Sequence, residues 1–163
     1  MSDEIPVEIK GLVPTPAGTG VFLGHGDKVI TIFIDAAVAM AITMLVEKIE
    51  RPRPLTHDLI SSIFLGLGIR ATRVLIHDLK DGTFYARLHL VQENESSGNR
   101  RFARTDQTTG TGSQPLALEQ KCPVFVTRAV WDAAEDMSWA LGQGDEPPAK
   151  EGKDDAEPPG DAD

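Results

Sequence analysis

The feature that most restricts how this chain can fold is a pair of alternating segments joined by Asp81-Gly82. Residues 70–79 and 84–91 both alternate between apolar and polar side chains, which is typical of two antiparallel strands around a two-residue turn. Such a turn pairs Lys80 with Thr83, and the other pairs follow by counting. We expect one face to lie on the core, with Arg73 and His77 among its apolar members Leu75, Leu79, Phe84, Ala86, Leu88 and Leu90. On the other face we expect Asp78 opposite Tyr85, Ile76 opposite Arg87, and Val74 opposite His89.

Three β-prone runs and a helical pattern precede this hairpin. The runs are Val7–Val13, Val21–Leu23 and Lys28–Ile34, and turn-forming residues separate them. A helix is predicted over Ala36–Lys48, with Asp35 as its N-cap. Because this helix is apolar on nearly every side, we expect it to be buried.

A second helix is predicted from His57 to Leu67, with Thr56 as its cap. Apolar residues recur along it at helical spacing and predict a core stripe of Leu59, Ile60, Ile63, Phe64 and Leu67.

Shorter signals follow the hairpin. They indicate a short strand near residues 100–104, a short helix over Pro115–Gln120, a strand over Pro123–Thr127 and a closing helix over Ala129–Leu141. Together the elements predict an α+β fold in one compact domain, residues 5–141. Its sheet is expected to be mixed or antiparallel, around the central hairpin and the buried apolar helix.

Charge separates this domain from the last 22 residues. Residues 142–163 hold eight acids and two bases, so they carry −6 of the total charge of −9. They are rich in Pro and Gly and have no apolar residue larger than Ala, so we expect a disordered acidic tail. Since the tail causes most of the acidity, the low isoelectric point argues only weakly against a nucleic-acid partner.

The expected compartment is the reducing cytoplasm. The chain has one cysteine, Cys122, which excludes an internal disulfide framework. Its N-terminus is acidic and resembles no secretory signal, and the longest apolar run is too short to span a bilayer. We therefore expect no membrane partner.

Two His-Asp pairs, His57-Asp58 and His77-Asp78, are the main candidates for chemistry. Isolated titratable residues are most often structural, so one alternative is that the first pair starts a helix and the second caps the turn. The other is that the helix start and the hairpin face converge, bringing Asp58, Asp78 and a histidine into one hydrolytic site.

Arginines form the second candidate group. They would contact the phosphates of a nucleic acid, or equally would form a solvated surface with scattered ion pairs. The set is Arg51, Arg53, Arg70, Arg73, Arg87, Arg100, Arg101 and Arg104.

Two blocks of residues resemble the bifunctional nuclease domain family of bacteria and plants. The first is Arg53-Pro54-Leu55-Thr56-His57-Asp58-Leu59, and the second is Asp78-Leu79-Lys80-Asp81-Gly82-Thr83-Phe84-Tyr85-Ala86-Arg87-Leu88. The resemblance implies a small α+β domain that self-associates and hydrolyses both DNA and RNA. The chain departs from the family pattern at Val38, where the pattern has an acid, and at Asp106–Ser113, which lacks the family's Arg, Pro and second Asp.

The expected function is therefore that of a nuclease with broad specificity. Asp78 would activate water, directly or through a divalent cation (Mg²⁺ or Mn²⁺) for which it is the first candidate ligand. Arg87 would neutralise charge on the phosphate, and His57 or Asp58 would complete the acid–base pair. Nucleic-acid contacts are expected from Arg53, Arg73, Tyr85, His89, Arg100, Arg101 and Arg104.

Two alternatives remain open at this level. The departures from the family pattern favour a binding or assembly module that keeps the fold without hydrolysis. A pocket between the His57 helix and the hairpin would instead make the domain a small-molecule sensor. In each case we expect a homo-oligomer, with a dimer favoured, because so small a domain has too little core to cover an apolar helix on every side.

Overall fold

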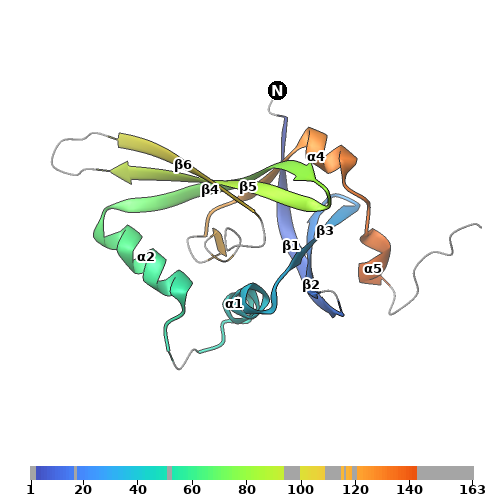
Figure 1. Cartoon of the computed structure of the whole chain (residues 1–163), viewed down its shortest axis with the longest axis horizontal. Coiled ribbons are helices and arrows are strands. Elements are labelled where there is room, and N and C mark those ends of the chain that lie inside the picture. Colours follow the sequence, from blue (N-terminus) through green and yellow to red (C-terminus); the bar gives the residue numbers. More distant parts are fainter. Residues whose placement is uncertain are drawn as a thin grey trace, which may run out of the picture.

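The computed structural model describes residues 3–16, 18–50, 53–93, 100–108, 115, 117–118 and 121–142. Seven strands form a sheet in the order β3-β2-β1-β7-β4-β5-β6, with helices packed against it (Figure 1). The strands are β1 (Glu4–Thr15), β2 (Gly18–His25), β3 (Lys28–Ile34), β4 (Ile69–Lys80), β5 (Thr83–Glu93), β6 (Arg100–Thr108) and β7 (Val124–Thr127). The helices are α1 (Ala36–Val46), α2 (Thr56–Gly66), α4 (Arg128–Ala133) and α5 (Ser138–Gly142).

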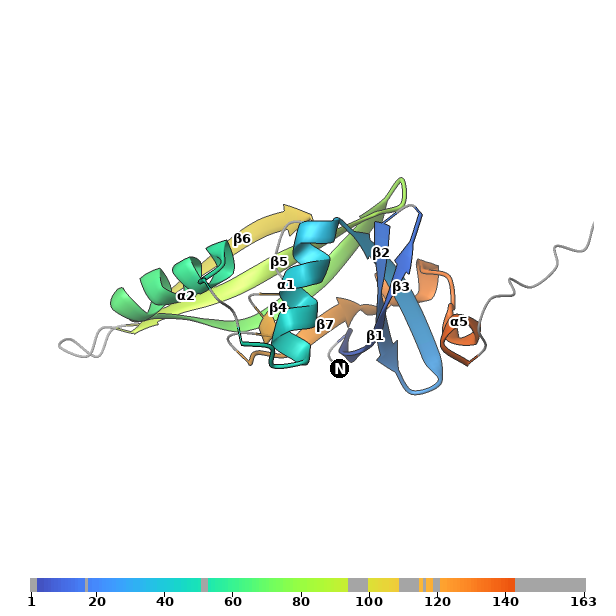
Figure 2. The same ribbon diagram turned by 90° about the horizontal axis from the view of Figure 1, so that it is seen from below.

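The sheet is mixed, and the predicted α+β class is confirmed. Neighbouring strands are antiparallel except β4 and β7, which run parallel. β1 joins two halves of the sheet, because residues 4–7 pair with β7 and residues 8–15 pair with β2. The pairing with β2 has an irregularity between Ile9 and Gly11, shortly after this change of partner. Figure 2 shows β1–β3 running across the direction of β4–β6.

The core lies where these two halves meet. Its fully buried side chains come from both, and include Val21, Leu23, Ile30, Ile32, Val74, Ile76, Leu88 and Val126. α1 adds Ile42, and α4 adds Val130 and Trp131. Residues far apart in the sequence therefore close one hydrophobic cluster, which holds the hairpin in place.

The turn of the hairpin forms as predicted. Lys80 pairs with Thr83, Leu79 with Phe84, and Asp78 with Tyr85. Asp81 (φ 50°) and Gly82 (φ 75°) both adopt the left-handed conformation that this two-residue turn requires.

Beyond the turn, the predicted register is wrong by one residue. An irregularity between Ile76 and Asp78 leaves His77 as an extra residue, so Arg87 faces Leu75 rather than Ile76. The same shift places His89 opposite Arg73 rather than Val74. Because side chains alternate along a strand, a one-residue slip exchanges the two faces.

As a result the core face holds Val74 and Ile76, both fully buried, instead of Leu75 and Arg73. Leu75 is still buried, at 8% exposure, but it lies among the polar residues and beside Phe125 of β7. Phe84 and Leu88 are buried as expected, and Tyr85, Arg87 and His89 alternate with them on the opposite face.

α1 confirms its predicted cap and corrects its predicted burial. The Asp35 carboxylate accepts a hydrogen bond from the Val38 backbone N–H at 2.9 Å, as an N-cap should. The helix ends at Val46, two residues earlier than predicted, and Lys48 adopts φ 53°. Only one side of the helix is buried, and Met40 on the other side is 57% exposed.

α2 departs further from the sequence prediction. Thr56 is its first helical residue rather than its cap, and the Asp58 side chain accepts a hydrogen bond from the Leu55 backbone N–H. None of its residues is buried, although Ile60 packs against the core from outside. The predicted core stripe is wrong at Leu59, Ile63 and Leu67, which are exposed because α2 reaches the sheet mainly along β4.

The predicted closing helix is two helices. Residues 134–137 separate α4 from α5, and Asp136 between them accepts hydrogen bonds from the backbone N–H groups of Val29 and Ser138. β6 is longer than predicted and reaches Thr108. In the predicted helix 115–120, residues 115, 117 and 118 are helical.

Two other predictions concern residues outside the described ranges. These are the acidic tail from residue 143 onward and residues 109–113 of the segment that departs from the family pattern. Within the described ranges, no helix has the length and apolar character needed to cross a membrane.

Candidate functional site

The polar face of the hairpin brings five of the eleven predicted site residues onto one surface. Alternation along β5 places Tyr85, Arg87 and His89 together, and all three are half-buried. Pairing with β4 puts Asp78 beside Tyr85 and Arg73 beside His89. The predicted grouping of Asp78, Tyr85, Arg87 and His89 on one face therefore follows from the backbone, and the corrected register adds Arg73, which was predicted on the core face.

The register of β6 extends these pairs into three rows across the sheet. The rows are Arg73, His89 and Arg104; Leu75, Arg87 and Asp106; and Asp78, Tyr85 and Thr108. Arg100 and Arg101 lie further along β6, opposite Glu93 and Gln92.

Asp78 is held as an ion by its neighbours. Lys80 Nζ lies 2.6 Å from its carboxylate, and the Leu79 backbone N–H donates to it at 2.9 Å. The hydrogen bond from Lys80 is the largest cause of a pKa below the usual 3.8, and His77 lowers the pKa further through its charge. The same hydrogen bond raises the pKa of Lys80.

This pairing changes what Asp78 can do. A carboxylate with a lowered pKa removes protons poorly at neutral pH, so it is better suited to orienting water or holding positive charge. His77, the extra residue in β4, is the histidine that interacts with it, and Lys80 also lies 5.7 Å from the centre of the Tyr85 ring. Strand irregularities often re-aim side chains at functional sites.

Arg73 has a structural role on this face. Its guanidinium forms an ion pair with Glu4 of β1 and lies 5.9 Å from the centre of the Phe125 ring of β7. These contacts tie three strands together, so Arg73 is less available for phosphate than its position implies.

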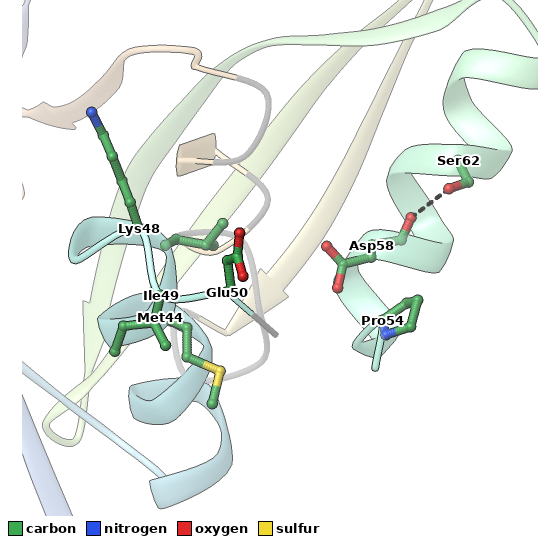
Figure 3. Close-up of a pocket in the computed structure, with 8 residues that line it drawn as sticks. Met44, Lys48, Ile49, Glu50, Pro54, Asp58 and Ser62 are labelled. Carbon is green, nitrogen blue, oxygen red and sulfur yellow. Dashed lines mark hydrogen bonds between the residues drawn. The ribbon is translucent and has the colours of Figure 1, made fainter. Parts of the chain in front are cut away.

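His57 and Asp58 lie elsewhere. They occupy the first turn of α2, which lies along the part of the sheet opposite the β4–β5 turn (Figure 2), whereas Asp78 is next to that turn. Asp58 and Ser62 of α2 line a cavity of about 590 Å³ (Figure 3). Met44 of α1 and Lys48, just after the end of α1, also line it. The structure does not bring the two His-Asp pairs together, and the hairpin does not line this cavity.

The described residues do not fit a resident metal ion. Among them, no group of three or more His, Cys, Asp or Glu side chains could hold one. Among the described side chains at this face, the Asp78 carboxylate is already paired with Lys80 and the Glu4 carboxylate with Arg73. Cys122 is half-buried, and burial raises the pKa of its thiol, so it is poorly suited to act as a nucleophile.

Sequence reasoning missed Lys80 and Glu4 at this surface, whereas it singled out the His77-Asp78 pair as a candidate. Lys80 could have been predicted from the sequence, because it is two residues after Asp78 and residues i and i+2 of a strand lie on the same face. His77 was assigned to the core face by the uncorrected register. Glu4 is 69 residues from Arg73 and had no local signal.

Comparison with known proteins gives a family and two relatives. The model of the family described as "Bifunctional nuclease domain" matches residues 21–138. Two uncharacterized proteins of Mycobacterium tuberculosis, from strains CDC 1551 / Oshkosh and ATCC 25618 / H37Rv, are each 35% identical to this chain over 106 residues. The match covers 65% of this chain and spans 58% of the length of each relative.

Proposed function

Since the chain belongs to the bifunctional nuclease domain family, we propose that it hydrolyses phosphodiester bonds in DNA and RNA, and that it does so in the cytoplasm. The observation that carries the proposal is the polar face of β4 and β5, where Asp78, Tyr85, Arg87 and His89 share one surface. A nucleic acid lying across this face would meet cations for its phosphates and an aromatic ring for its bases.

The chemistry is centred on the row nearest the turn. His77 interacts with Asp78 and carries an imidazole, the side chain that most often acts as a general base, so it serves as the base. Asp78 orients the histidine and the attacking water. Lys80 and Arg87 stabilise the negative charge that develops on the phosphate oxygens. His57 and Asp58, as residues of α2, take no part in this step.

The test compares two carboxylate-to-amide changes in the same hairpin. We expect Asp78→Asn to fold normally and to lose at least tenfold of the cleavage rate on plasmid DNA and total RNA, about 1.4 kcal/mol of transition-state stabilisation. Asp81→Asn removes the same charge at the turn, where Asn tolerates the left-handed conformation, and should keep full activity.

Assays with Mg²⁺, Mn²⁺, Zn²⁺ and a chelator would show whether a cation arrives with the substrate, as Mg²⁺ often does with phosphates. Unchanged cleavage by Asp78→Asn, or no cleavage by the parent protein under any of these conditions, would contradict the nuclease proposal.

The second candidate function is a nucleic-acid-binding module without hydrolysis. It is favoured by the ion pair that already engages Asp78, and by the lack of a metal-ligand group among the described residues. Under this function the protein shifts nucleic acid in a gel without cleaving it. Arg87→Gln should then weaken binding and reduce its salt dependence, whereas Lys10→Gln on β1 should not.

A further inference from the structure

A second cavity lies between α1 and the strands β1 and β2. Its volume is about 430 Å³, which is within the usual range of small-molecule pockets. β1 and β2 form one wall, and α1 with its C-cap residue Glu47 forms the other. It shares no lining residue with the cavity of about 590 Å³ beside α2, so the two cavities lie on different sides of α1.

Apolar side chains provide most of the lining of this second cavity. They are Leu12 and Pro14 of β1 and Ala39, Met40 and Val46 of α1. The remaining neutral side chains that line it are those of Thr19 and Thr43, which add hydroxyl groups. Met40 and Val46 are exposed, so a molecule can enter from solvent beside them. The cavity therefore offers an apolar surface to the hydrocarbon part of a small molecule.

Glu47 places a negative charge at this cavity. Among the described residues that line it, Glu47 is the one that is charged, and no described residue forms an ion pair with its carboxylate. α1 also has no basic residue in its last turn. The C-terminal end of a helix carries a partial negative charge, so α1 and Glu47 both favour a cation here. The next residue, Lys48, lines the cavity beside α2 instead.

We propose that this cavity binds a small apolar molecule that carries one protonated amine. The hydrocarbon part lies between Leu12 of β1 and Met40 of α1, and the ammonium group donates hydrogen bonds to the Glu47 carboxylate. An anion of the same shape would be repelled by Glu47, and a neutral molecule would keep only the apolar contacts. Charge therefore decides which ligands the site accepts.

This site is separate from the surface that carries the proposed nuclease function. Its lining comes from β1, β2 and α1, whereas Asp78, Tyr85, Arg87 and His89 lie on β4 and β5. The proposal thus goes beyond nucleic-acid cleavage, and a binding experiment tests it whether or not the protein cleaves nucleic acid.

The experiment compares hexylamine, hexan-1-ol and hexanoate, which share one alkyl chain and differ in charge. Isothermal titration calorimetry on the full chain should give the highest affinity for hexylamine and the lowest for hexanoate. Added salt should weaken the binding of hexylamine but not that of hexanol. In NMR spectra, hexylamine should shift the backbone amide signals of Leu12, Thr43 and Glu47 and leave those of Asp58 and Ser62 unchanged.

Three substitutions separate the contribution of charge from that of apolar contact. Glu47→Gln should weaken hexylamine binding about three- to fivefold and leave hexanol binding unchanged. Glu50→Gln is the matched control, because Glu50 is also an exposed acid near the end of α1 but lines the other cavity, and it should have no effect. Met40→Ala should weaken hexylamine and hexanol alike. Met40 is 57% exposed, so this change leaves the core intact.

Circular dichroism should show that all three variants are folded. The absence of hexylamine binding at millimolar concentration, equal affinity for hexanoate, or NMR shifts confined to Asp58 and Ser62 would each overturn the proposal. Equal effects of Glu47→Gln and Glu50→Gln would also overturn it, because the charge at the second cavity would then have no specific role.

Discussion

Single residues show how position decides what a carboxylate does in this protein. Asp35 and Asp58 each accept a backbone hydrogen bond at the start of a helix, whereas Asp78 is paired with Lys80 on the open sheet face. Asp136 accepts two backbone hydrogen bonds and joins the start of β3 to the segment before α5. Of these four carboxylates, Asp78 is the one that lies on the polar face beside a histidine that interacts with it.

Asp136 allows a prediction about acid stability. The hydrogen bond from the Ser138 backbone N–H is the largest cause of the lowered pKa of Asp136. The hydrogen bond from the Val29 backbone N–H also lowers this pKa. A carboxylate with a lowered pKa stabilises the fold above its usual pKa of 3.8, and this contribution is lost as the pH falls through the lower value in the folded state.

We therefore predict that Asp136→Asn lowers the melting temperature at pH 7 but differs less from the parent protein as the pH falls below the folded pKa. Asp132→Asn, an exposed acid on α4, serves as the control and should change little. A difference between Asp136→Asn and the parent that does not shrink at low pH would exclude this role of the charge.

Among the secondary-structure elements, the β4–β5 turn requires glycine at position 82 because of the backbone conformation and not because a side chain would lack room. A Cβ added at Gly82 would meet nothing within 4 Å, yet its φ of 75° is strained for any residue with a side chain. We predict that Gly82→Ala costs about 1–2 kcal/mol of unfolding free energy. Denaturant titration measures this directly.

Gly66 at the end of α2 is the matched control, because a Cβ there also meets nothing within 4 Å and its φ is not in the left-handed region. Gly66→Ala should stabilise the protein by about 0.4–1 kcal/mol by restricting the unfolded chain. Equal effects at the two glycines would show that backbone conformation is not the cause.

For the whole molecule, we predict that residues 143–163 contribute little to stability. Their composition of acids, Pro and Gly offers almost no apolar area to bury. Truncation after Gly142 keeps α5, whose Leu141 lies next to Gly11 of β1, and should change the melting temperature by no more than about 2 °C. A larger fall in a thermal scan would mean that the tail packs on the domain.

Signals carried by neighbouring residues were sufficient for much of the fold. Asp81-Gly82 determined the hairpin turn because few residue pairs accept two left-handed conformations in succession. Asp35 determined the start of α1 because its side chain reaches a backbone N–H three residues away. The shared face of Tyr85, Arg87 and His89 followed from the two-residue period of a strand alone.

Only the tertiary structure decided the features that depend on distant partners. The extra residue His77 moved Leu75 and Arg73 to the polar face of the hairpin. In this register Val74 and Ile76 are buried in a core to which both halves of the sheet contribute. Asp136, in the break between α4 and α5, accepts a hydrogen bond from the backbone N–H of Val29, which is 107 residues away in the sequence. The apolar residues of α2 have the spacing of a core helix. This spacing shows which side chains share one face, but not whether another part of the protein packs against that face. For the same reason the sequence could not tell that Asp58 and Asp78 lie apart.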